Sequence, residues 1–195
     1  MLEVPRMAGY DFGQVGRSPV TLEELRQLKA TVGFTKEDEK ALRRMGDVLA
    51  EDAEALVDDW RKIIGAQEHL AHWFVGPDGK PDDRYKSAVK PRFVQWVRDM
   101  FERPFDQSWL DYQEEIGLRH TPRKKNKTDS AATPPLVPLR YLLAFAAPVL
   151  EAARRRLHEK KLFADEIDTL HAAWTKAVIL TLVLWSRPYV KADLW

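Results

Sequence analysis

Five histidines are the side chains of this sequence best suited to bind a metal, and the chain contains no cysteine. They stand at His69, His72, His120, His158 and His171. No two have the H-E-x-x-H spacing, and there is no G-x-S-x-G elbow, G-x-G-x-x-G turn or P-loop. The lack of cysteine excludes thiolate zinc sites, iron–sulfur clusters and haem attached through C-x-x-C-H. The remaining metal chemistry is ligation by a neutral imidazole.

The sequence context distinguishes the five histidines from one another. His158 follows three arginines near an expected helix end, a solvated position that favours positive charge. His171 lies among apolar residues and is expected to be hydrogen-bonded in the core or in an interface. Whether His69 or His72 can approach a bound metal stays open.

His120 stands at the end of an expected amphipathic helix, on the same face as Trp109, Gln113 and Ile116. The expected helix over 83–102 carries Val89, Phe93 and Trp96 on one stripe, and an upstream helix carries Trp60. These apolar side chains could line a slot for a flat cofactor ligated by His120. An ordinary aromatic core with a histidine favoured by the helix C-terminus is the alternative, and periodicity alone favours it.

Helices must position these residues, because period-two alternation is almost absent from the sequence. Thr21 with Glu24 and Thr35 with Asp38 are helix-start signals of the capping-box type. Asp106 is expected to cap the helix that leads to His120. The expected helices cover 21–31, 35–65 with a bend or break, 66–74 in part, 83–102, 107–120, 138–160 and 164–186.

Composition limits the function classes. A chain of 195 residues with 45% hydrophobic residues fits one globular domain. Its 31 basic and 30 acidic residues leave a net charge of +1, so neither nucleic acid nor an anionic membrane is an expected partner. The N-terminus has no signal-peptide core, and the apolar run over 177–185 is too short to span a bilayer. A cytoplasmic location is therefore expected.

Several segments together resemble the protoglobins, single-domain relatives of the globin-coupled sensors. The main one is WLDYQEEIGLRH at 109–120, followed by KKN at 124–126 and TD at 128–129. Other similar segments are GYDFG at 9–13, FTKEDEKALRRMGDVL at 34–49, HL at 69–70, PDG at 77–79, RF at 92–93, RYLLAF at 140–145 and LWSRPYV at 184–190. The resemblance covers nearly the whole chain.

The resemblance implies an all-α, globin-type helical sandwich. One domain over 1–195 would comprise an irregular arm over 1–20, an additional N-terminal helix over 21–31 and a globin core over 35–190. It would bind haem b non-covalently, with His120 as the iron ligand. The family's other haem-facing positions fall on Trp60, Arg61, Val89, Arg92, Phe93, Ile116, Phe145 and Val149. The resemblance also implies a homodimer formed through the two C-terminal helices.

Two residues depart from the family pattern. The family usually has a tyrosine directly after the distal tryptophan, and this chain has Arg61 after Trp60. We expect the guanidinium to point outward or toward a haem propionate, because desolvating a charge costs more than one hydrogen bond returns. A guanidinium above the iron is the alternative. Pro91 lies inside the helix over 83–102 and predicts a kink or a late helix start.

The expected function is reversible binding of O2, CO or NO by a gas sensor, carrier or scavenger. The alternative is a haem enzyme acting on NO, nitrite or peroxide, which a charged Arg61 near the iron would favour. The sequence contains no reductase pattern and no acid–base pair that can be placed beside the iron, so gas binding is preferred.

Overall fold

The computed structural model describes residues 7–195, and these residues form helices and turns with no strand among them. The α-helices are α1 (Leu22–Thr31), α2 (Lys36–Leu49), α3 (Ala53–Ala66), α4 (Glu68–Ala71), α5 (Asp83–Glu102), α6 (Gln107–Leu118), α7 (Leu139–Ala144), α8 (Ala146–His158) and α9 (Ala164–Ser186). Short 3-10 turns are η1 (Ala50–Asp52), η2 (His72–Phe74) and η3 (Arg187–Tyr189). The all-α expectation is confirmed.

Two capping boxes begin α1 and α2, as the sequence predicted. The Thr21 amide donates to the Glu24 carboxylate at 2.7 Å, and the Glu24 amide donates to the Thr21 hydroxyl at 3.1 Å. Thr35 and Asp38 form the equivalent box at the start of α2. Both boxes satisfy backbone donors that the first turn of a helix leaves unpaired.

Two expected long helices are each divided. The stretch over 35–65 breaks at η1, in agreement with the bend or break expected there. The helix expected over 138–160 was wrong as one element, because it is interrupted at Phe145 between α7 and α8. Pro148 accounts for the break, since it has no N–H to offer the Ala144 carbonyl and its ring crowds that carbonyl.

Pro91 does not delay the start of α5. The Tyr85 amide donates to the Asp82 side chain at 2.8 Å, and the helix begins at Asp83 and continues through the proline. The expected late start was therefore wrong. Because Pro91 has no N–H, the Ser87 carbonyl lacks its usual helical donor.

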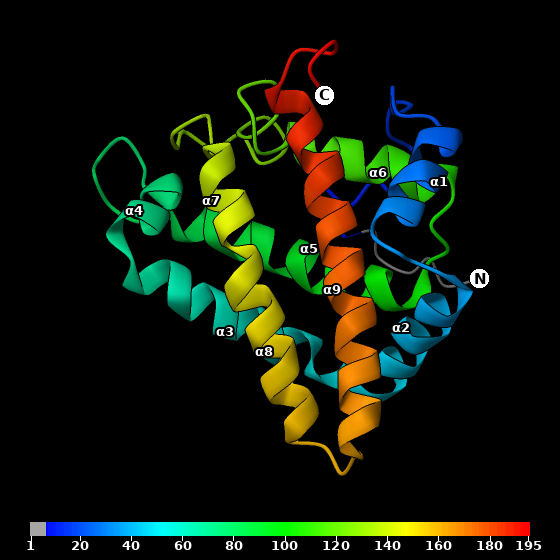
Figure 1. Ribbon diagram of the computed structural model, residues 1–195. Coiled ribbons are helices and arrows are strands. Elements are labelled where there is room, and N and C mark those ends of the chain that lie inside the picture. Colours follow the sequence, from blue (N-terminus) through cyan, green and yellow to red (C-terminus); the bar gives the residue numbers. More distant parts are fainter. Residues whose placement is uncertain (1–6) are drawn as a thin grey trace, which may run out of the picture.

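The core lies where α8 and α9, a side-by-side pair, cross the other helices (Figure 1). α9 packs on α2, α6 and α8, while α3 packs on α5 and α8. The largest fully buried side chains include Trp109, Trp174 and Met45. α1 lies beside α6 and contributes Leu25 to the core (Figure 1). The division into an arm, an extra helix and a core over 35–190 stays a prediction.

The last long helix is more apolar over its length than the run over 177–185 suggested. Ala164–Tyr189 is long and apolar enough to cross a membrane by length and composition. Half of its most apolar window is buried inside the protein, where α9 packs on α2, α6 and α8. A buried core helix has the same composition, and the packing of α9 places it in that class.

Candidate functional site

A cavity of about 220 Å³ lies between α3, α5, α6, α8 and α9. It brings together eight of the nine residues that the sequence reasoning assigned to the haem pocket. These are His120, Trp60, Val89, Arg92, Phe93, Ile116, Phe145 and Val149. Arg61 is the exception, since it does not line the cavity. Most of the lining is apolar and aromatic, which suits a largely apolar ligand.

His120 follows the end of α6 by two residues and presents its ring to the cavity. Its Nδ1 lies 2.8 Å from the Ile116 carbonyl oxygen. A carbonyl only accepts, so Nδ1 carries the proton and Nε2 keeps a free lone pair. Burial and the nearby Lys125 ammonium lower the pKa of His120 to about 4, although the bond to Ile116 opposes them. The ring is therefore neutral at pH 7 and competent to ligate a metal.

Trp185 on α9 fixes the plane of the His120 ring from one side. The two rings stack with centroids 5.3 Å apart and an interplanar angle of 27°. The Trp185 indole N–H donates to the Gln113 side-chain oxygen at 3.0 Å. Close approach of the helices requires Gly117, where an added Cβ would lie 3.1 Å from the Trp185 Cα. Sequence reasoning missed Trp185, because an aromatic residue on a buried helix face carries no distinguishing signal.

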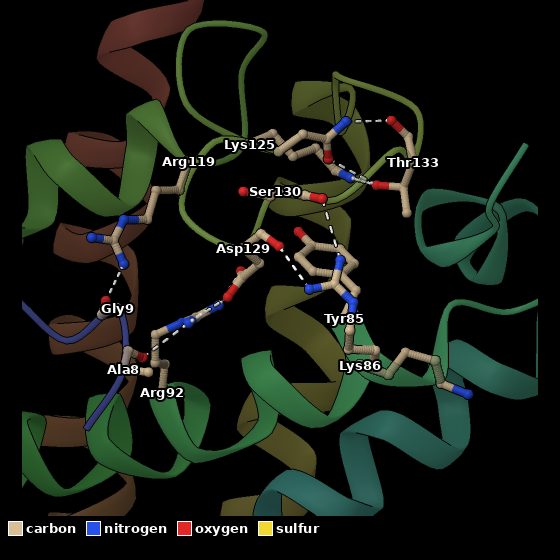
Figure 2. A network of polar contacts seen from close by, with 12 residues as sticks. Ala8, Gly9, Tyr85, Lys86, Arg92, Arg119, Lys125, Asp129, Ser130 and Thr133 are labelled. Carbon is tan, nitrogen blue, oxygen red and sulfur yellow. Dashed lines mark hydrogen bonds and ion pairs between the residues drawn. The ribbon is translucent and has the colours of Figure 1, made fainter. Parts of the chain in front are cut away.

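Cationic side chains surround one end of the cavity, and an N-terminal arm lies against them (Figure 2). Arg92 forms a bidentate ion pair with Asp129 at 3.0 and 2.6 Å and donates to the Ala8 carbonyl at 3.1 Å. Arg119 pairs with Glu115 at 2.9 Å and donates to the Gly9 carbonyl. Both arginines therefore have partners within the protein.

Gly9 allows the arm to approach this closely. Its φ is +73°, a conformation that side chains with a Cβ rarely adopt. An added Cβ would also lie 2.5 Å from the Arg92 guanidinium and 2.7 Å from the Thr128 methyl. The arm thus contacts residues that line the cavity.

Lys125 is the cavity cation that lacks an acidic partner among residues 7–195. The residue is only 4% exposed, and its ammonium donates to the Trp73 carbonyl at 2.9 Å. It also donates to the Thr133 hydroxyl at 2.7 Å (Figure 2). Burial lowers the pKa of Lys125 to about 8. In the sequence this residue stood out only as part of the KKN segment at 124–126. A buried ammonium that faces a cavity fits a carboxylate brought by a ligand.

Arg61 points away from the cavity. Its guanidinium donates to the Lys86 carbonyl on α5 at 2.8 Å. That carbonyl lies one residue before Ser87, whose own helical donor Pro91 removes. The two departures from the family pattern, Arg61 and Pro91, therefore meet in the same turn of α5. The guanidinium is held by a backbone carbonyl, and any contact of Arg61 with a cofactor stays a prediction.

The other four histidines lie outside the cavity lining. His69 and His72 are exposed, with the His69 ring 5.3 Å from the Tyr141 ring. His158 is exposed in the last turn of α8, and the His171 Nε2 lies 3.1 Å from the Leu150 carbonyl oxygen. Both placements agree with the sequence reasoning. Within residues 7–195 no cluster of three or more metal-binding side chains occurs, so His120 offers single-residue ligation.

The cavity fits a planar apolar cofactor that carries a metal and acidic groups. The free Nε2 of neutral His120 provides one metal ligand. The aromatic and aliphatic lining provides apolar contact for the ring system. Lys125 provides an unpaired cation for a carboxylate. Haem has this combination of properties, whereas an apolar ligand without a charge would leave the ammonium buried and unpaired.

A comparison with family models finds one match, a family described as Protoglobin, over residues 21–195. No curated protein matches the chain.

Proposed function

Because the chain belongs to the protoglobin family, and is therefore a globin-type haem protein that binds gas, we propose that His120 ligates a non-covalently held haem b. We further propose that the protein binds O2, CO or NO reversibly as a sensor, carrier or scavenger. The observation that carries this proposal is the neutral imidazole of His120 beside the apolar cavity, with Nδ1 held by Ile116 and Nε2 free.

Different residues of the cavity have different proposed roles. Ile116 and Trp185 hold the orientation of the His120 ring. Trp60, Val89, Phe93, Phe145 and Val149 supply apolar surface that excludes water from the bound group. Bound haem would supply an iron that can take up a small gas. The lining opposite His120 then determines which gases are held.

The cationic end of the cavity is proposed to hold the haem propionates. Lys125 is the principal partner, because it has no carboxylate of its own and donates only to neutral oxygens. Arg92 and Arg119 contribute positive potential, although Asp129 and Glu115 offset much of it. A carboxylate near Lys125 converts a buried lone charge into a pair.

A homodimer is proposed through the face formed by α7, α8 and α9. The face keeps large apolar residues accessible, with Leu143 47% and Ile179 40% exposed. Val183 is half-buried, while Leu184 lies in the core. Exposed apolar residues on neighbouring helices favour a two-fold pairing that covers them.

A cytoplasmic location is also proposed, because it fits a chain with no cysteine.

The alternative, a haem enzyme acting on NO, nitrite or peroxide, drew its support from a charged Arg61 beside the iron, which would favour anionic ligands. The guanidinium instead contacts the Lys86 carbonyl, so the cavity lacks that charge. Gas binding is therefore the better-supported function. Hydrogen peroxide is neutral, so its binding does not depend on a charged side chain such as Arg61.

Reconstitution with haem tests the proposal directly. The wild type should bind haem stoichiometrically and give a histidine-ligated ferrous–CO spectrum. His120→Ala should lose haem on gel filtration, whereas the matched control His69→Ala, an exposed histidine outside the cavity, should retain it. A His120→Ala protein with unchanged spectrum and retention would reject the assignment.

A further inference from the structure

A contiguous group of tryptophans begins at the proposed iron ligand. Trp185 stacks on His120, and its ring centroid lies 5.7 Å from that of Trp96 on α5. Trp96 in turn lies 6.0 Å from Trp60 on α3 and 5.8 Å from Trp174 on α9. These separations place neighbouring rings in direct contact. We call Trp60, Trp96, Trp174 and Trp185 the tryptophan group.

Hydrogen bonding distinguishes one member of the tryptophan group. The indole N–H groups of Trp60, Trp96 and Trp174 are buried and have no acceptor within residues 7–195. The Trp185 N–H donates to the Gln113 oxygen at 3.0 Å. That oxygen is the negative end of an amide dipole, which stabilises positive charge on the indole. Because an amide is not a base at neutral pH, the Gln113 oxygen accepts the hydrogen bond without taking the indole proton.

Indole is among the most readily oxidised side chains, and here it touches the proposed iron ligand. We propose that Trp185 is a one-electron donor to the haem pocket, which enables the protein to reduce hydrogen peroxide and to hold one oxidising equivalent as a protonated Trp185 radical cation. The proposal rests on the proposed ligation of haem by His120. It adds an activity to gas binding and names the residue that supports it.

The electrons and atoms balance. Hydrogen peroxide takes two electrons and two protons and becomes two water molecules. Trp185 would supply one of these electrons and keep its N–H, and bound haem would supply the other, so the reaction is a single turnover. The two protons come from solvent.

From Trp96, one branch of the tryptophan group leads into the core. Trp174 is fully buried and leads only to Phe101, at a centroid distance of 5.5 Å. Phe101 is itself 2% exposed, and a phenyl ring is much harder to oxidise than an indole. Among the described ring contacts, this branch of the tryptophan group therefore ends in the core and offers no further indole or phenol beyond Trp174.

Electron paramagnetic resonance of the ferric holoprotein, frozen after mixing with hydrogen peroxide, tests the proposal. The wild type should give an organic radical signal whose hyperfine pattern changes with ring-deuterated tryptophan and not with ring-deuterated tyrosine. Trp185→Phe should lose that signal, and Trp185→Tyr should replace it with a tyrosyl signal. Trp109→Phe is the matched control, because Trp109 is a buried tryptophan that stacks on Phe105 outside the cavity, and the signal should persist.

The outcomes separate this inference from the proposed function. A holoprotein with a normal histidine-ligated spectrum but no tryptophan-dependent signal would overturn the inference and leave gas binding intact. A chain that holds no haem through His120 would overturn both. If the Trp185 variants fail to fold, peptide mapping of the peroxide-treated wild type decides. Oxygen addition should concentrate on the peptide that contains Trp185, and its absence there would refute the donor role.

Discussion

Replacing Arg61 with leucine separates two roles that the sequence left open. In the structure the guanidinium donates to the Lys86 carbonyl at 2.8 Å and does not line the cavity. Arg61→Leu should therefore leave the O2 dissociation rate unchanged. Its effect should appear in the free energy of unfolding, because a bond between α3 and α5 is lost.

The magnitude follows from the kind of hydrogen bond. Bonds that involve a charged group contribute about 1.5–3 kcal/mol, and the partial exposure of Arg61 places it near the lower end. A loss of about 1.5 kcal/mol lowers the midpoint of thermal unfolding by roughly 3–6 °C in a domain of this size. Pro91 should influence the loss, since it removes the helical donor of the neighbouring Ser87 carbonyl. A double-mutant cycle with Pro91→Ala measures that coupling.

Stopped-flow displacement of O2 by CO, paired with thermal unfolding of the holoprotein, measures both effects. Arg98→Leu is the matched control, because it removes an exposed arginine from α5 and should change neither quantity. A rise in the O2 dissociation rate of about tenfold or more, equivalent to about 1.4 kcal/mol, would show that Arg61 holds the gas. That result would refute the outward placement.

Three further predictions follow from the site and the packing. His120→Ala should lose haem when an apomyoglobin scavenger is added, at a rate far above that of the wild type. Multi-angle light scattering should give twice the chain mass of 22.6 kDa, and a particle of 22.6 kDa at micromolar concentration would reject the dimer. Burial would raise the pKa of Asp38, but hydrogen bonds from Lys176 and Thr35 outweigh it and hold that pKa below its usual value. The charged form is therefore favoured in the folded state, so wild-type stability falls relative to Asp38→Asn below about pH 4. Urea titrations of both proteins across that range check the sign.

Local signals predicted the elements that depend on local chemistry. Thr21, Thr35 and Asp106 begin helices because each side chain satisfies backbone donors within three residues, and this pattern is visible in the sequence. His120 was found through its position after an amphipathic helix and through the family resemblance. The break at Phe145 was missed, although Pro148 was present to signal it.

Long-range partners could not be predicted, because nothing in the local pattern identifies them. Lys125 appeared only within the KKN segment at 124–126, and only the fold buries it against Trp73 and Thr133. Trp185 and Gln113 are 72 positions apart and meet through the packing of α6 on α9. The partner of Arg61 is a backbone carbonyl, a group that every residue carries.

The burial of Lys125 has a consequence for the quality control of newly made chains. With a pKa of about 8 in place of 10.5, keeping this ammonium charged at neutral pH destabilises the cofactor-free fold by about 3 kcal/mol. A haem propionate at the proposed position beside Lys125 would remove this penalty, so the folded state would be favoured more strongly once the cofactor is present. Chains without haem would then unfold more often and be exposed to proteases for longer. The lifetime of the chain would thus depend on whether it carries its cofactor.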